Sequence, residues 1–202
     1  TQGVQKRLGK RAAGIISREL KRPAQGEGRA EQRFLSAVTH KGMLTLWDTV
    51  TAQAERVYEL AGEYGLAHHM LAPILTAALA AGHDAVACPD PMAPERLAHL
   101  IFPDLSLAFV TSTQEVPWPH RAYRRLRLDA MADQDAYRIN RPRLRFAKRV
   151  AAALLDEGVA GLAQAKEAHD RLEKLYNPYV DFDGVARTAD QVADEVLALR
   201  DE

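Results

Sequence analysis

The stretch RVYELAGEYGLAHHMLAPILTAALAAG, residues 56–82, decides the fold class of this chain. Its first seven residues include β-branched and aromatic side chains, which predicts a buried strand. Residues 67–81 are rich in alanine and leucine, so we expect a helix that Gly82 ends as a C-terminal cap. Pro73 lies inside this segment, and we expect it to kink or shorten the helix. A strand, a glycine-containing loop and a helix therefore follow one another.

The same alternation continues downstream of this stretch. Residues 84–89 (DAVACP) and 105–112 (LSLAFVTS) predict two further strands, and the second is almost continuously apolar, as in a parallel sheet covered on both faces. Between them, residues 89–103 (PDPMAPERLAHLIFP) predict a short helix bounded by prolines. Strands and helices that alternate in this way indicate an α/β fold with a parallel sheet and right-handed crossovers.

The flanking segments predict additional elements. Upstream, residues 33–50 (RFLSAVTHKGMLTLWDTV) predict a strand, a turn at residues 40–42 and the start of a helix. Downstream, residues 123–129 (YRRLRLD) are expected to be extended. The remaining expectations are helices over 133–157 and 159–176 with a break at Gly158 or Gly161, a loop over 177–185 and a last helix over 188–200.

The charge distribution is uneven although the formal net charge of the 202 residues is zero. Residues 1–30 hold eight Lys/Arg against two acids, and residues 121–149 hold ten against three. Residues 1–22 predict a basic amphipathic helix, followed by a linker around Pro23. We interpret residues 1–30 as a basic N-terminal arm and linker that frays from the fold, with a membrane- or nucleic-acid-binding arm as the alternative.

The composition is that of an ordinary globular protein. No window of 18 residues is wholly apolar, so we expect neither a membrane span nor a membrane partner. The N-terminus lacks the apolar region of a secretory signal, and it begins with Thr1 rather than Met, which we interpret as a piece of a longer protein. A single cysteine, Cys88, favours a reducing, cytoplasmic location.

The loop GEYGLAHH, residues 62–69, has the outline of a phosphate-binding loop. In the pattern GxxxxGK[ST], backbone N–H groups surround the phosphates, the lysine neutralises charge and the hydroxyl binds magnesium. When the pattern is laid on this loop, Ala67 stands at the last glycine, His68 at the lysine and His69 at the hydroxyl residue. The loop therefore lies in the right context but lacks three of its defining residues.

The surrounding motifs resemble a family of largely uncharacterised bacterial P-loop ATPase-like proteins that contain two P-loop halves in tandem. The likeness covers about residues 33–185 and is to the second half. The matching elements are residues 83–91 (HDAVACPDP), residues 100–105 (LIFPDL), His169 and Asp170 with Glu173 and Tyr176, and Asp181 with Phe182. The resemblance implies a three-layer P-loop NTPase-like α/β domain over residues 31–202, with a parallel sheet and a C-terminal helical section from residue 120.

The same loop departs from the family where the chemistry would occur. His68 is mostly neutral at pH 7 and cannot replace a permanent ammonium group. His69 cannot replace a hydroxyl on magnesium, which prefers oxygen ligands. The apolar strand over 105–110 ends in Thr111 and Ser112. The acidic residue of the Walker B kind, which helps to hold magnesium, is therefore also missing. These departures argue against ATP hydrolysis and magnesium binding, whereas binding of ATP or another nucleotide through backbone N–H groups stays open.

Three other groups of side chains are candidate sites. Seven residues suggest a transition-metal site, but their spacing favours exposed or capping roles: His68, His69, His83, Cys88, Asp90, His99 and His120. His169 and Tyr176 share a helix face with leucines, so we expect them to form a buried pair that fixes the helix to the sheet, with a role in a site as the alternative. The arginines of residues 121–149 could bind phosphates, although a solvated helix face is the simpler interpretation.

The leading hypothesis from the sequence is a degenerate nucleotide- or phosphate-binding domain with a structural or regulatory role, paired with a second P-loop half or another copy of itself. Its candidate binding residues are Gly62, Glu63, Gly65, Ala67, His68, His69, Arg124 and Arg125. One alternative is an active ATPase or phosphotransferase that uses the arginines of residues 121–149. A weaker alternative is a nucleic-acid-binding module that uses the two basic segments.

Overall fold

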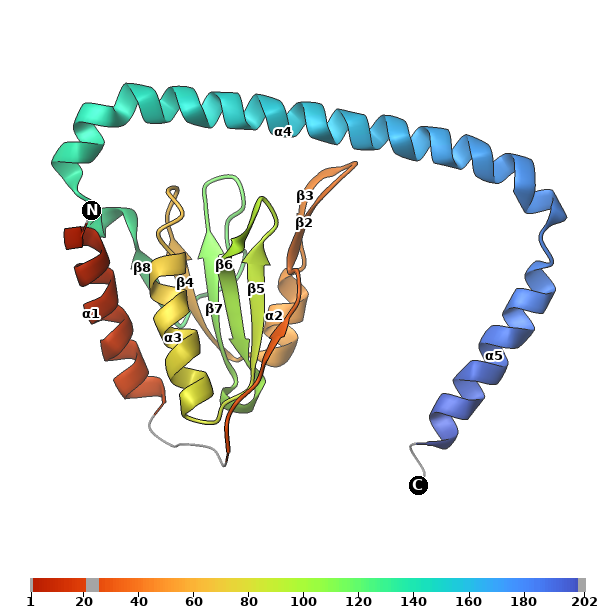
Figure 1. Cartoon of the computed structure of the whole chain (residues 1–202), viewed down its shortest axis with the longest axis horizontal. Helices are drawn as coiled ribbons and strands as arrows, with labels where there is room; N and C mark the ends of the chain where they lie inside the picture. Colours follow the sequence, from red (N-terminus) through yellow and green to blue (C-terminus); the bar gives the residue numbers. More distant parts are fainter. Residues whose placement is uncertain (1, 21–25, 200–202) are drawn as a thin grey trace.

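The computed structural model describes residues 2–20 and 26–199. A six-stranded sheet in the order β1-β5-β6-β7-β4-β8 forms the body, with a separate β2–β3 hairpin beside it (Figure 1). The strands are β1 (Ala30–Gln32), β2 (Ser36–Thr39), β3 (Gly42–Thr45), β4 (Arg56–Ala61), β5 (Ala85–Asp90), β6 (Ala93–Phe102), β7 (Leu107–Ser112) and β8 (Arg124–Arg127). The helices are α1 (Gln2–Glu19), α2 (Trp47–Gln53), α3 (His68–Ala80), α4 (Gln134–Tyr176) and α5 (Phe182–Ala198).

The sheet is mostly parallel and is covered on both faces. The pairs β1–β5, β4–β7 and β4–β8 are parallel, whereas β6 is antiparallel to both of its neighbours. Alternate residues of β4 enter two different cores: Tyr58 and Leu60 pack with α1 and α3, and Val57 packs with α2. The α/β class expected from the alternating elements is therefore confirmed.

The predicted helix within residues 89–103 is wrong, because most of this segment is strand β6. Leu100 and Phe102 belong to the core under α1 and α3, whereas Ile101 belongs to the core under α2. A run of apolar residues that is buried alternately on both faces suits a central strand and not a short surface helix. The start of a helix predicted near residue 42 is also displaced, since residues 42–45 pair with β2 and the helix begins at Trp47.

Helix α1 packs against α3 and is part of the body, which corrects the expectation of a frayed arm. Val4, Leu8, Ala12 and Ile15 are buried in the same core as α3. The amphipathic pattern of the segment was predicted, but the surface that covers its apolar face is visible only in the fold. The expected linker around Pro23 lies at residues outside the described part of the chain.

Helix α3 continues through Pro73 without ending, which corrects the expected shortening. Its predicted C-terminal cap is confirmed. Gly82 has a φ of 85° and donates its N–H to Leu79 O, while His83 N donates to Ala78 O. These two bonds form a Schellman motif, which requires a left-handed residue that glycine adopts without strain.

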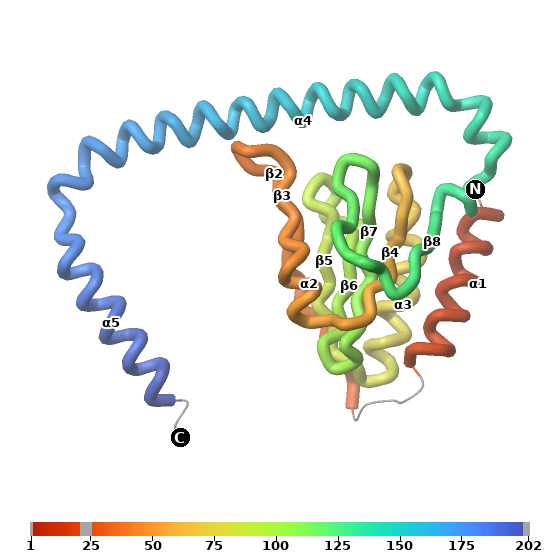
Figure 2. Tube along the Cα trace, turned by 180° about the vertical axis from the view of Figure 1, so that it is seen from behind, coloured from red at the N-terminus to blue at the C-terminus, as the bar shows by residue number. Residues whose placement is uncertain are grey.

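Helix α4 is continuous over 43 residues, so the predicted break at Gly158 or Gly161 is wrong. A glycine in an exposed helix costs only about 1 kcal/mol relative to alanine, and long helical segments on both sides outweigh it. Figures 1 and 2 show α4 running above the ends of the strands and then past the β2–β3 hairpin, with α5 at its far end. Helix α5 begins at Phe182, six residues before the predicted start at residue 188.

The buried pair expected of His169 and Tyr176 is not formed, because α4 contains no buried residue. Both side chains are exposed on a part of α4 that extends beyond the body. The sequence pattern marks an apolar helix face, and it does not show whether the fold covers that face. Of the helices that the structure describes, none combines the length and apolarity needed to cross a membrane.

Candidate functional site

The carboxyl ends of β4, β7 and β8 meet at a point where the strand order changes direction. After β4 the chain passes through α3 toward β5, whereas after β7 it crosses to β8 on the other side of β4. In open α/β sheets, ligands bind outside the carboxyl ends of strands at such a switch point. The loop that follows β4 is the GEYGLAHH segment, which leads into α3.

A cavity of about 790 Å³ occupies this position, and we call it the strand-end crevice. Its volume is in the range of small-molecule sites. Its walls come from the three strand ends, the segment after β8 and the first turn of α4. The lining residues are Ala61, Gly62, Glu63, Ser112, Thr113, Gln114, Pro117, Arg125, Arg127, Asp129, Ala130, Gln134 and Tyr137.

A buried carboxylate under the crevice orients two of its lining residues. Glu59, on β4, is only 7% exposed. The Ser112 hydroxyl donates to its Oε1 at 2.6 Å, and Arg125 Nε lies 3.3 Å from its Oε2. A buried charge requires such partners. Glu59 therefore fixes the end of β7 and the direction of the Arg125 side chain.

Arg127 is the other arginine of the crevice. It lies two residues after Arg125 on β8, so the two side chains emerge on the same face of the sheet. Arg125 is paired with Glu59, whereas no acidic group lies within ion-pair distance of Arg127 in the part of the chain that the structure describes. The exposed Arg127 guanidinium therefore supplies a positive charge that the protein itself does not neutralise.

Asp129 contacts the first part of the GEYGLAHH loop. The Glu63 N–H donates to both carboxylate oxygens of Asp129, at 3.1 and 3.3 Å. A Cβ at Gly62 would lie 3.0 Å from Asp129 Oδ1, so glycine permits this close approach. Burial raises the pKa of Asp129 above its ordinary value, and the nearby charge of Glu63 adds to this effect. One loop N–H is thus occupied by an anionic group of the protein.

Glu63 and Tyr64 connect the loop to α4. Glu63 accepts hydrogen bonds from Gln114 N at 2.7 Å and from Lys148 Nζ at 2.8 Å. Burial acts to raise the pKa of Glu63, but these two bonds outweigh it and hold the pKa below its usual value. The Tyr64 and Tyr137 hydroxyls are hydrogen-bonded, and burial together with this bond raises the pKa of Tyr64 to about 12.

Three of the predicted binding residues, Gly62, Glu63 and Arg125, line the crevice. The others lie elsewhere. Ala67 is buried, Gly65 adopts a φ of 64°, and Arg124 lies over the Tyr123 ring at 5.5 Å. His68 faces β6, where its Nδ1 accepts a hydrogen bond from Leu97 N at 3.1 Å.

The histidines of the loop do not provide a replacement for the missing lysine. Burial lowers the pKa of His68, and the neighbouring His69 and Arg96 act in the same direction. The two rings lie 5.8 Å apart at the start of α3. A neutral His68 that already accepts a backbone hydrogen bond cannot supply positive charge to a phosphate.

Sequence reasoning missed Ser112, Asp129 and Tyr137 as residues of the crevice, and it included Arg127 only as one of the arginines of residues 121–149 that could bind phosphates. The alternation of Arg125 and Arg127 about the buried Leu126 could have identified two arginines on one face of a strand. No local pattern could have shown that β8 pairs with β4. Asp129 and Tyr137 enter the crevice only because this pairing places the start of α4 next to the GEYGLAHH loop.

The structure does not gather the seven residues weighed for a metal into one cluster. Cys88 is buried, and burial raises its thiol pKa to about 11. His99 is buried as well, which lowers its pKa to about 4, and its Nδ1 accepts from Thr111 N. His83 Nδ1 lies 2.5 Å from Asp104 Oδ2. These groups serve the packing of the sheet.

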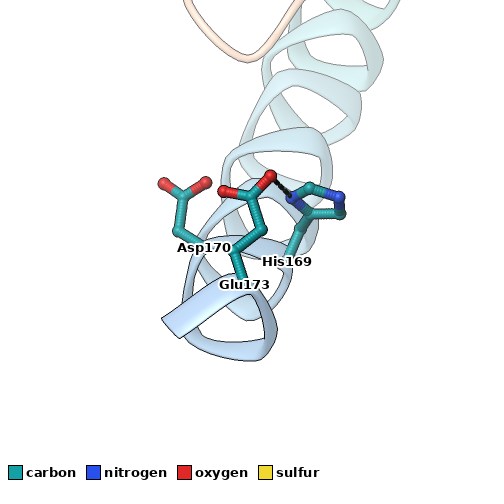
Figure 3. A group of neighbouring side chains, drawn as sticks. All are labelled: His169, Asp170 and Glu173. Atoms are coloured by element: carbon teal, nitrogen blue, oxygen red, sulfur yellow. Dashed lines mark ion pairs between the residues drawn. The ribbon is translucent and has the colours of Figure 1, made fainter. Parts of the chain in front are cut away.

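Within the described residues, a different set has the proximity of metal ligands: His169, Asp170 and Glu173 on α4 (Figure 3). His169 Nδ1 is 3.5 Å from Glu173 Oε1, and Lys166 Nζ lies 2.8 Å from both oxygens of Asp170. The lysine neutralises the Asp170 carboxylate, and His169 is exposed. We interpret the set as ion pairs along a solvated helix face.

Comparison of the chain with protein-family models, with curated proteins and with solved structures returned no match.

Proposed function

We propose that the strand-end crevice binds a small phosphate-bearing molecule, with a nucleotide as the leading candidate, and does not hydrolyse it. The observation that carries this proposal is the presence of Arg125 and Arg127 in a crevice of about 790 Å³ at a switch point of the sheet. Guanidinium groups bind phosphates through paired, charge-assisted hydrogen bonds. The resemblance of the flanking motifs to P-loop ATPase-like proteins supports the same ligand class.

The charges of the crevice favour binding over catalysis. Glu59 balances Arg125, and Lys148 balances Glu63, which leaves Arg127 to meet an anion. The loop contributes no lysine, and its His68 faces β6 rather than the crevice. Phosphoryl transfer requires a positive group beside the negatively charged phosphoryl oxygens and a bound metal ion. The loop has neither of the side chains that usually supply them.

Replacement of Arg127 by glutamine is the direct test of this proposal. We expect the affinity for ADP or ATP, measured by titration calorimetry with and without magnesium, to fall about 10- to 100-fold, since one charge-assisted hydrogen bond contributes roughly 1.5–3 kcal/mol. Arg124→Gln is the matched control, because Arg124 lies on the same strand but outside the crevice. Its affinity should equal that of the unmodified protein.

The same titrations separate the alternatives. Magnesium-dependent binding with turnover would establish an active ATPase or phosphotransferase in place of the proposed binding domain. Absence of binding by nucleotides and by inorganic phosphate would contradict the proposal and leave a structural domain. Equal losses in the Arg127 and Arg124 variants would show that general positive charge, and not the crevice, binds the anion.

Asp129→Asn should strengthen phosphate binding, since the Asp129 carboxylate occupies a loop N–H next to the two arginines. We expect the affinity for inorganic phosphate and for ADP to rise about tenfold, because removal of one nearby negative charge weakens repulsion of the ligand. Asp135→Asn, at an exposed position that does not line the crevice, is the control. An unchanged or lower affinity in the Asp129 variant would show that this carboxylate does not oppose the ligand.

A further inference from the structure

Helix α5 carries an apolar stripe that none of the other described residues of the chain covers. Val185, Ala189, Val192 and Val196 follow one another at helical spacing, and we call them the α5 stripe. Val185, Val192 and Val196 are 52–60% exposed. A helix of 17 residues is marginal in water by itself and depends on packing of its apolar face. The α5 stripe therefore needs a partner surface.

The body of the protein has an apolar groove of matching character. This hairpin groove has a volume of about 780 Å³ and lies between the β2–β3 hairpin, the β5–β6 turn and the middle of α4. Phe34 and Met92, on its rim, are 58% and 62% exposed. The other apolar side chains of its wall are Ala37, Val38, Pro91, Ala151, Leu154, Leu155 and Leu162.

We infer that the α5 stripe of one copy lies in the hairpin groove of a second copy, and that two chains exchange their helical arms in a dimer. Figures 1 and 2 show α5 at the far end of α4, beyond the side of the body that carries the hairpin. Reciprocal exchange places both stripes and both grooves in contact within one symmetric pair.

Charge favours contact of α5 with the groove of the second copy over contact with the α5 helix of that copy. Residues 182–198 contain four acidic residues and one basic residue. Residues 138–149 of α4, which lead directly into the groove wall, contain six basic residues and no acidic residue. Two α5 helices would repel one another, whereas α5 beside the basic part of α4 is attracted to it.

The length of the arm argues against insertion of α5 into the groove of its own chain. If the chain reversed at residues 177–181, α5 would run back along α4 for about 25 Å, at 1.5 Å per residue. That distance reaches only to about residue 160 of α4, so most of α5 would cover residues that lie outside the groove. A second copy has no such restriction.

The contact area is compatible with a specific dimer. A helix of this length presents a footprint of about 25 Å by 10 Å. Two exchanged helices and two grooves together would bury on the order of 1,000 Å², which is at the lower limit of a specific protein–protein interface.

Sedimentation and light scattering of the full chain test the inference, with a dimer expected at micromolar concentrations. Val192→Asp and Met92→Asp, which place a charge in the stripe and in the groove, should each produce monomers. Gln191→Asp adds the same charge to the polar face of α5 and should remain dimeric. Because α5 contributes no buried residue, the circular dichroism of the body should be unchanged in the Val192 variant. A monomeric unmodified protein would overturn the inference.

Mixed disulfide trapping identifies the contact itself. The native Cys88 is buried, so added cysteines are the reactive ones. Val192→Cys and Met92→Cys chains that carry different tags should form a disulfide-linked heterodimer when mixed and oxidised. A disulfide between two Val192→Cys chains would show contact between α5 helices, and an intrachain disulfide in the double variant would show self-insertion. Either result would overturn the exchange of arms.

Discussion

Replacement of Gly28 by alanine is expected to destabilise the protein by about 3 kcal/mol. A Cβ at Gly28 would lie 2.2 Å from the carbonyl oxygen of His83 and 2.9 Å from its nitrogen. Both are backbone atoms, and His83 N is already bonded to Ala78 O in the cap of α3. The added methyl group therefore has to displace β1 from the end of α3, with loss of the bond from Gly28 N to Leu79 O.

Urea unfolding followed by circular dichroism measures this effect. Gly9→Ala is the matched control, because a Cβ at Gly9 in α1 would meet nothing within 4 Å apart from its chain neighbours and the adjacent helix backbone. There we expect a gain of about 0.5–1 kcal/mol, since alanine loses less backbone entropy in a helix. If the free energy of unfolding of the Gly28→Ala variant lay within about 0.5 kcal/mol of that of the unmodified protein, the close contact between β1 and α3 would be disproved.

Glu19→Gln is expected to reduce the free energy of unfolding by about 3 kcal/mol at pH 7. The Glu19 side chain is only 4% exposed and joins the end of α1 to β4. It accepts hydrogen bonds from the Tyr58 hydroxyl and from Arg56, both at 2.5 Å. Loss of its charge leaves the buried side of this network unbalanced. Glu31→Gln, which removes an exposed ion pair with Arg33, should change stability by less than about 0.5 kcal/mol.

The effect of Glu19 should depend on pH in a defined direction. Burial acts to raise the pKa of Glu19, but hydrogen bonds from Tyr58, Arg56 and Arg18 hold it below the ordinary value of 4.5. The stabilisation is therefore complete above pH 4.5 and is lost as the pH falls through the lowered pKa of the folded state. Urea unfolding between pH 7 and pH 3 should show that the free energies of unfolding of the Glu19→Gln variant and of the unmodified protein converge at the acidic end. A constant difference would exclude titration of Glu19 as the cause.

Local patterns predicted the elements that depend on neighbouring residues. Strand β4, helix α3 and the cap at Gly82 follow from side-chain type, periodicity and turn chemistry. The same information failed for β6, where flanking prolines suggested a bounded helix, because the pairing of β6 with β5 and β7 is not encoded locally. Periodicity also identified the apolar faces of α1 and α4, but α1 is covered by α3 and α4 is exposed.

The sequence by itself determined the α/β class, the strand-loop-helix unit over residues 56–82 and the absence of the lysine and the Ser/Thr residue that a phosphate-binding loop carries at the positions of His68 and His69. These features depend on residue identity and on spacings of a few residues. Only the tertiary structure decided that Arg127 and Asp129 adjoin this loop, that His68 faces β6 and that α5 stands apart from the body. Those relations depend on strand order and helix packing, which join residues far apart in the chain through contacts that no local pattern records.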